Sequence, residues 1–220
     1  MPGVSCRRLK LLLALLLQTG LSQAASEEDL FFKSVADVNE GELRFLTQAP
    51  DKPVHHHQNR IIIDDTSLET GWIHLEQCHA HLDAVPSSQV VYREGFVRDL
   101  RVLRAENIGR AWVEGPTVQL ENVSHNALLC IQADTRALSP LEGKRYFLRN
   151  GPYLRRFLDG YYPMRVSLNV HIATPKIRFS SITPATQPGL QVKTTAQDVD
   201  IEALFEGRLS TEMAFELVQP

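Results

Sequence analysis

The sequence predicts a mainly β protein, with sandwich-like antiparallel sheets in one or two small domains. Apolar and polar residues alternate with a period of two in the C-terminal third, and turn-forming residues recur at roughly ten-residue spacing elsewhere. Such alternation is typical of strands with one face in the core and one face in water. Regular short strands separated by turns are typical of sandwiches and small barrels.

The first 24 residues have the composition of a secretory signal peptide. Arg7, Arg8 and Lys10 precede an apolar run over residues 11–17, and small residues follow at Ser22 and Ala24. The run is too short for a stable membrane anchor. We therefore expect cleavage near Ala24 and a periplasmic or secreted product.

The chain that remains after cleavage is acidic. Cleavage would remove three of the 23 basic residues and none of the 26 acidic ones, which leaves a net charge of −6. An acidic protein is poorly suited to nucleic acid unless it carries a local basic face. No second apolar run is long enough for a transmembrane segment. We expect neither a nucleic-acid partner nor a transmembrane segment in the mature chain.

The first predicted domain spans residues 25–138. A loop rich in proline and histidine covers residues 48–60, and strand-like segments follow it. These segments are residues 61–63, 72–85, 89–92, 96–103, 111–123 and 127–134. Pro140 and Gly143 then predict a linker over residues 139–144.

The second predicted domain is a β-sandwich-like unit over residues 145–220. Pro152 near the start and Gly160 at the end predict a short helix near residues 152–159. Strict alternation predicts strands over residues 166–172, 199–205 and 209–217. Glu206 and Gly207 lie between the last two strands and predict a tight hairpin.

Two cysteines remain after cleavage, Cys78 and Cys130. An even number of cysteines in an oxidising compartment predicts a disulfide. A thiolate metal ligand or two separate thiols are the alternatives.

Histidines are concentrated between residues 55 and 81. Residues two apart in a strand share a face, so His79, His81 and Asp83 are expected to project together. Two imidazoles and a carboxylate form a candidate site for zinc or copper, with help from the loop histidines 55–57. The alternative is an ordinary polar rim, because the sequence contains no recognised zinc motif.

Arginines and tyrosines alternate between residues 145 and 162. Arginine beside an aromatic ring suits recognition of an envelope protein or an anionic envelope polymer. The alternative is a solvated face whose arginines pair with neighbouring acids. The candidate partner-binding residues are Arg145, Arg149, Tyr153, Arg155, Arg156, Tyr161 and Tyr162.

No motif for nucleophilic catalysis or phosphate binding occurs in the sequence, and no cofactor is expected. The favoured hypothesis is an exported, non-catalytic binding or adaptor protein of the cell envelope. An exported metal-binding protein and a hydrolase acting on envelope polymers are the alternatives.

Overall fold

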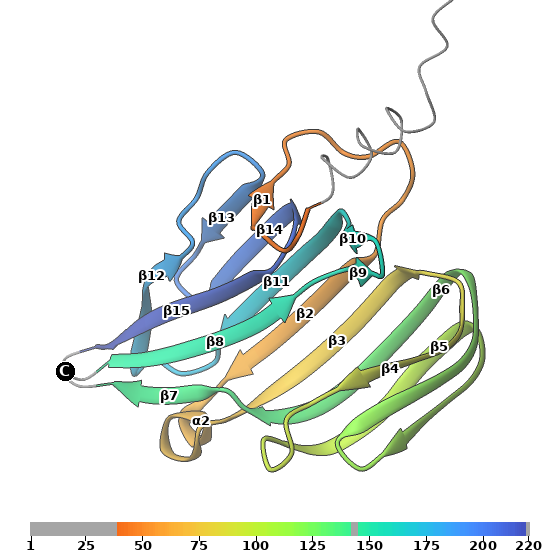
Figure 1. Cartoon of the computed structure of the whole chain (residues 1–220). Coiled ribbons are helices and arrows are strands. Elements are labelled where there is room, and N and C mark those ends of the chain that lie inside the picture. Colours follow the sequence, from red (N-terminus) through yellow and green to blue (C-terminus); the bar gives the residue numbers. More distant parts are fainter. Residues whose placement is uncertain (1–38, 142–144, 219–220) are drawn as a thin grey trace, which may run out of the picture. The chain divides into compact units, whose positions relative to one another are not determined.

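Strands make up most of the part of the chain that the structure describes (Figure 1). The computed structural model describes residues 39–141 and 145–218, and the predicted leader lies outside them. The first strands are β1 (Arg44–Phe45), β2 (His56–Ile63), β3 (Trp72–Leu82), β4 (Val85–Val91), β5 (Val97–Glu114), β6 (Thr117–Arg136), β7 (Leu138–Leu141) and β8 (Arg145–Tyr153). The remaining strands are β9 (Arg156–Phe157), β10 (Gly160–Tyr161), β11 (Met164–Ile172), β12 (Ile177–Thr183), β13 (Leu190–Thr194), β14 (Asp198–Glu206) and β15 (Leu209–Leu217).

Two main sheets pack face to face, which confirms the predicted sandwich-like fold. The larger sheet has nine strands in the order β1-β14-β11-β2-β3-β6-β4, and β13 and β5 pair with β14 and β6. The smaller sheet has the order β12-β15-β8-β7, and β9 and β10 form a separate two-stranded hairpin. One apolar core joins the two main sheets. Its fully buried members include Ile61 and Leu168 from the larger sheet and Leu148 and Phe215 from the smaller one.

The strand β6 bends so that the larger sheet curls over itself. Its C-terminal half pairs with β3, and its N-terminal half pairs with β4. Asn122 and Asn126 adopt positive φ at the bend, a conformation that asparagine tolerates better than most residues. The curl returns Tyr92, which follows β4, to the middle of β3, where its hydroxyl donates to Gln77. A second apolar cluster around Leu120 and Leu129 lies in this curl.

The parallel pair β2–β11 joins the two predicted domains. Val166 of β11 lies opposite His57 of β2, so residues before and after the predicted linker share one sheet. The described residues also fall in one compact unit. The division at residues 139–144 therefore differs from the structure. Turn residues identify a break between strands, but they do not show whether those strands belong to one sheet.

The helix predicted near residues 152–159 is wrong. Gly151 has a φ of 98°, and Tyr153 pairs with Leu209 as the end of β8. The chain then forms the hairpin β9–β10, in which Gly160 pairs with Phe157. The described helix is instead α2 (Asp65–Thr70), which the Asp64 carboxylate caps by accepting from the Ser67 backbone N–H.

The strands before and after Gly207 match the prediction, but they do not form a hairpin. β14 belongs to the larger sheet and β15 to the smaller one. The turn therefore carries the chain from one sheet to the other. Period-two alternation shows that each strand has a buried face, and that face is compatible with either sheet.

Replacement of Gly207 by alanine should destabilise the fold. Gly207 has a φ of 86°, and a Cβ atom there would lie 2.0 Å from the Glu42 carbonyl oxygen. Strain of this kind costs on the order of 2 kcal/mol. We therefore expect urea denaturation to show a free energy of unfolding lower by this amount in Gly207→Ala. Gly115→Ala is the control, because Gly115 also has positive φ but has open space around it. Equal losses in the two variants would rule out the close approach to Glu42 as the cause.

Candidate binding site and buried histidine cluster

Two rows of the larger sheet carry polar residues on the face that packs against the smaller sheet. In one row His57 lies opposite His79, and in the next Asn59 lies opposite Gln77. All four residues are buried. Aliphatic residues flank them, with Val166 and Leu168 in β11 on one side and Leu129 and Ile131 in β6 on the other. The core therefore contains a polar patch, and the loop predicted over residues 48–60 is wrong from residue 56 onward, because His57 and Asn59 belong to β2 and are buried.

Three histidines form the centre of this patch, and we call His55, His57 and His79 the histidine cluster. The rings of His57 and His79 lie 4.3 Å apart between centroids, and those of His55 and His79 lie 5.3 Å apart. The His55 Nε2 and His79 Nδ1 atoms share a hydrogen bond of 3.0 Å. The other ring nitrogen of His79, Nε2, is buried and has no hydrogen-bond partner among residues 39–141 and 145–218.

Two tyrosines hold the facing layers against the patch. Asn59 lies beside the cluster, and its side-chain Oδ1 atom lies 2.9 Å from His57 Nε2. Its Nδ2 atom donates to the Tyr153 hydroxyl of β8 over 2.8 Å. Tyr92 donates from the curled part of the larger sheet to Gln77, whose amide also contacts His57. The cluster therefore lies at a seam where the smaller sheet and the curl both meet β2 and β3.

Burial keeps the histidine cluster neutral. It lowers the pKa of His55 to about 4, since the nearby Asp83 carboxylate only partly opposes desolvation. Burial and then the neighbouring His55 ring lower the pKa of His57 to about 3. Desolvation, together with the other two rings, places the pKa of His79 well below its usual value. An imidazolium in this seam would be both desolvated and close to like charges.

The predicted metal-ligand set His79, His81 and Asp83 does not share a face. Pairing between β3 and β6 is irregular between Ala80 and Leu82, and His81 has a φ of 54°. His79 therefore points into the seam, whereas His81 is exposed and lines a different pocket, beside His56. Asp83 pairs with Arg155. Across residues 39–141 and 145–218, no group of three or more His, Cys, Asp or Glu side chains is arranged to hold a metal.

The ion pair Asp83–Arg155 ties the β9–β10 hairpin to the end of β3. Both guanidinium contacts are short, with Nε 2.9 Å and NH2 2.6 Å from the two carboxylate oxygens. The hydrogen bonds with Asp83 raise the pKa of Arg155. Two parallel hydrogen bonds of this type fix the orientation of both side chains. The pair therefore sets where the hairpin lies.

Three exposed apolar side chains lie on the segment that this pair anchors: Leu154, Phe157 and Leu158, which we call the apolar tip. Leu158 is fully exposed at the turn between β9 and β10. Leu154 and Phe157 line a pocket of about 190 Å³, which we call the tip pocket. The other walls include Leu82, Val85, Leu120 and His55, so the pocket leads toward the histidine cluster.

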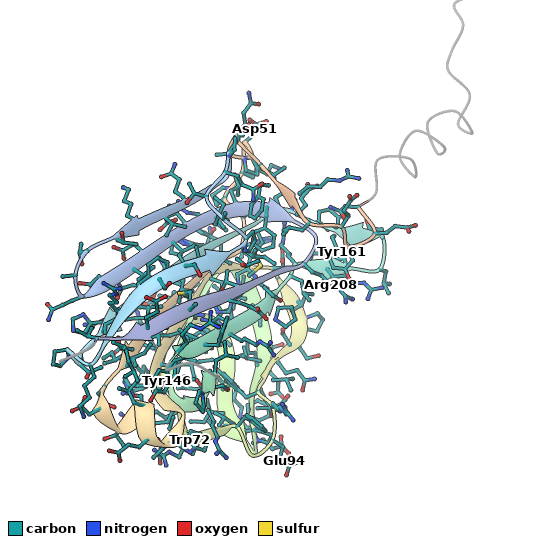
Figure 2. The ribbon with its side chains drawn as sticks, turned by 90° about the vertical axis from the view of Figure 1, so that its left-hand side faces the viewer. Asp51, Trp72, Glu94, Tyr146, Tyr161 and Arg208 are labelled. Atoms are coloured by element: carbon teal, nitrogen blue, oxygen red, sulfur yellow. A yellow bond between two sulfur atoms is a disulfide. The ribbon has the colours of Figure 1, made fainter. Side chains whose placement is uncertain are left out.

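The structure separates the other predicted partner-binding residues. Tyr153 is buried in the seam, and Tyr161 is buried at the other end of the hairpin. Figure 2 shows Tyr161 beside Arg208, whose Nε donates to its hydroxyl over 2.8 Å. The remaining residues divide between the hairpin (Arg155, Arg156, Tyr162) and the smaller sheet (Arg145, Arg149). Arg149 pairs there with Glu212 at 2.8 Å. The predicted set is therefore not one surface, and its hairpin residues alone flank the tip.

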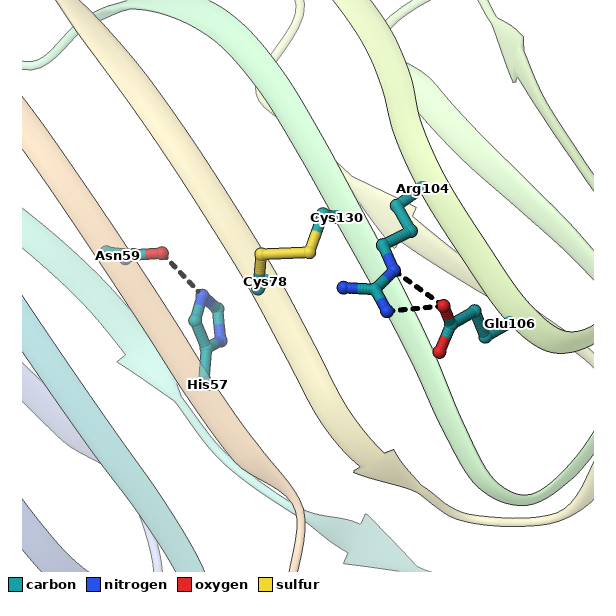
Figure 3. Close-up of a disulfide and its surroundings, with 6 residues drawn as sticks. All are labelled: His57, Asn59, Cys78, Arg104, Glu106 and Cys130. Atoms are coloured by element: carbon teal, nitrogen blue, oxygen red, sulfur yellow. Dashed lines mark hydrogen bonds and ion pairs between the residues drawn. A yellow bond between two sulfur atoms is a disulfide. The ribbon is translucent and has the colours of Figure 1, made fainter.

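The predicted disulfide between Cys78 and Cys130 is confirmed. It joins directly opposed residues of β3 and β6 (Figure 3). Cys78 precedes His79 in β3, so the disulfide lies on the other face of the sheet from the histidine cluster. That face is polar and half-exposed, with Gln58 on one side and Arg104 on the other. Arg104 also pairs with Glu106. The disulfide therefore closes a covalent loop without contributing to the tip pocket.

Comparison with protein-family models, with curated proteins and with solved structures found no match. Within the described residues, no helix is both long enough and apolar enough to cross a membrane.

The three residues of the apolar tip are visible in the sequence, but the predicted helix gave them a different interpretation. Leu154, Phe157 and Leu158 have the spacing of one helix face, so a helix over residues 152–159 would place them together with Tyr161 on one side. In the hairpin the same three residues are exposed. The β9–β10 hairpin forms a sheet of its own, and a single bridge between Asn39 and Tyr161 links it to another described segment, so its two-residue strands leave these side chains uncovered.

Proposed function

We propose that this protein is an exported, non-catalytic binding protein of the cell envelope that recognises a protein partner through the apolar tip. The observation that carries the proposal is an exposed apolar patch on an anchored hairpin. Exposed apolar groups that are contiguous and rimmed by polar residues are typical of interaction sites. Arg156 and Tyr162 supply the arginine and tyrosine side chains in which binding hot spots are enriched.

Export rests on the leader pattern and is supported by the disulfide. Structural disulfides persist in oxidising compartments and are rare in the cytosol. His79, His81 and Asp83 point into three different surroundings, so their arrangement does not support the metal-binding alternative.

A photo-cross-linking amino acid at position 157 tests the binding face in cells that export the protein. We expect p-benzoylphenylalanine in place of Phe157 to give a discrete cross-linked product. The same substitution at Val113 is the matched control, because both side chains are 38% exposed and Val113 lies on β5, away from the tip. Equal labelling at both positions would contradict the proposed face. A product retained in the cytosol with residues 1–24 attached would contradict export.

A further inference from the structure

The tip places a projecting apolar side chain next to a small pocket whose walls are partly apolar. Phe157 lines the tip pocket, and the next residue, Leu158, points fully into solvent. We propose that the partner is a second copy of this chain, and that Leu158 of each copy fills the tip pocket of the other. This inference rests on the proposed function, because it names the partner for the same face.

The size of the pocket fits one side chain. Its volume of about 190 Å³ is below the roughly 300–1,000 Å³ of sites for small-molecule ligands. It is close to the size of an apolar cavity of about 150 Å³ that accepts benzene. Val85, Leu120 and Val123 line it from the curl, and Leu154 and Phe157 line it from the hairpin segment. The polar part of its lining is His55, Asp83, Ser88, Arg155 and Arg156. A leucine side chain therefore meets apolar walls on two sides and lies beside the Asp83–Arg155 ion pair.

The adjacency of Leu158 and the pocket favours a two-fold dimer. In a two-fold interface the same patch is used by both subunits, so residue i meets residue j and j meets i. Leu158 is one residue from Phe157, which lines the tip pocket of the same chain. A two-fold axis that passes between Leu158 and this pocket therefore places Leu158 of each copy at the pocket of the other. A second copy of this chain brings its own tip pocket to Leu158. A protein of different sequence would need a similar pocket of its own.

Charge around the tip is also self-complementary. Arg156 and Asp159 flank Phe157 and Leu158, and both are exposed. Two hairpins that approach antiparallel around a two-fold axis bring Arg156 of one copy toward Asp159 of the other. Arg155 needs no partner, because Asp83 of its own chain already satisfies it. The charged rim therefore fixes the register without leaving a buried charge unpaired.

Sedimentation equilibrium of the exported protein tests the proposal. We expect the protein to dimerise reversibly within a range of protein concentrations that extends to about 200 μM. Transient complexes are detectable in this range. Leu158→Asp removes the inserted side chain, and Ser88→Trp fills the pocket from an exposed wall residue. Each variant loses both insertions and should raise the dimer Kd by about 100-fold or more, given roughly tenfold or more for each buried leucine.

Two controls isolate the contact. Leu103→Asp changes a leucine that is 53% exposed on β5, and Gln89→Trp changes the exposed neighbour of Ser88; neither residue lines the pocket. Both controls should dimerise like the wild type. A 1:1 mixture of Leu158→Asp and Ser88→Trp should recover part of the association, because one insertion is restored between an intact Leu158 and an intact pocket.

The possible outcomes separate the two proposals. A wild-type protein that stays monomeric, or a mixture that associates no better than either variant alone, would overturn the dimer. If position 157 then cross-links to a different protein, the proposed function stands and only its partner is wrong. A cross-linked product with twice the mass of the chain supports both proposals.

Discussion

The protein should lose on the order of 4 kcal/mol of unfolding free energy between pH 7 and pH 5 through His55 and His57. Burial lowers their pKa values to about 4 and about 3, below the unfolded value near 6.5. The unfolded chain therefore binds more protons than the folded chain in this window, so stability falls as the pH falls. Between pH 7 and pH 5, each histidine lowers the free energy of unfolding by about 2 kcal/mol.

The sign and the window follow from the direction of the shifts. The neutral rings contribute their full stabilising effect above about pH 6.5, and the effect is lost progressively toward the folded pKa values. Urea denaturation followed by the fluorescence of Trp72 and Trp112 measures the difference. Stopping at pH 5 keeps most carboxylates ionised, since their usual pKa values lie near 4.

Replacement of one histidine separates this effect from general acid sensitivity. His55→Gln should reduce the difference between pH 7 and pH 5 by about 2 kcal/mol, even though the variant is less stable at both pH values. His125→Gln is the matched control, because His125 is exposed on β6. The histidine cluster is not the cause if the two variants show the same pH dependence as the wild type.

Removal of the disulfide should cost about 4 kcal/mol. Cys78 and Cys130 are 52 residues apart, and closing a loop of that length restricts the unfolded chain by about this amount. We expect Cys78→Ser/Cys130→Ser to shift the urea midpoint down accordingly. Serine is suitable because both positions lie on the half-exposed polar face, away from the core.

Reduced wild-type protein is the control for the serine substitutions. If the restriction of the unfolded chain is the source of the stability, the reduced protein and the double variant should unfold at similar urea concentrations. A loss below about 1 kcal/mol in both would show that the unfolded chain is not restricted as this account requires. A loss confined to the double variant would assign the effect to local packing instead.

Much of the sheet structure could be predicted from alternation alone. Residues 209–217 coincide with β15, and the predicted strands 166–172 and 199–205 lie within β11 and β14. The disulfide followed from the compartment and the cysteine count. Strand partners could not be predicted, because a half-buried strand fits any sheet with an apolar face. The sheet order therefore came only from the structure.

The candidate site was harder to predict because it depends on irregular backbone. A strict period of two groups His79 with His81, but the irregular pairing at His81 reverses the alternation after it. The pattern also gives no sign that His57 and His79 are opposed, because their strands are paired by tertiary structure. The histidine-rich region was therefore recognised as unusual, whereas its arrangement as a neutral buried cluster was not.

The position of β11 restricts the order in which this protein can form. β11 lies between β14 and β2 in the larger sheet. The centre of this sheet therefore lacks a strand until residue 172 has left the ribosome or the export machinery. The contacts between β2 and β11 join residues more than a hundred positions apart, and such long-range pairing is slow. A chain delivered N-terminus first therefore leaves this edge of β2 unpaired until β11 arrives, and an unpaired strand edge is open to pairing with another chain.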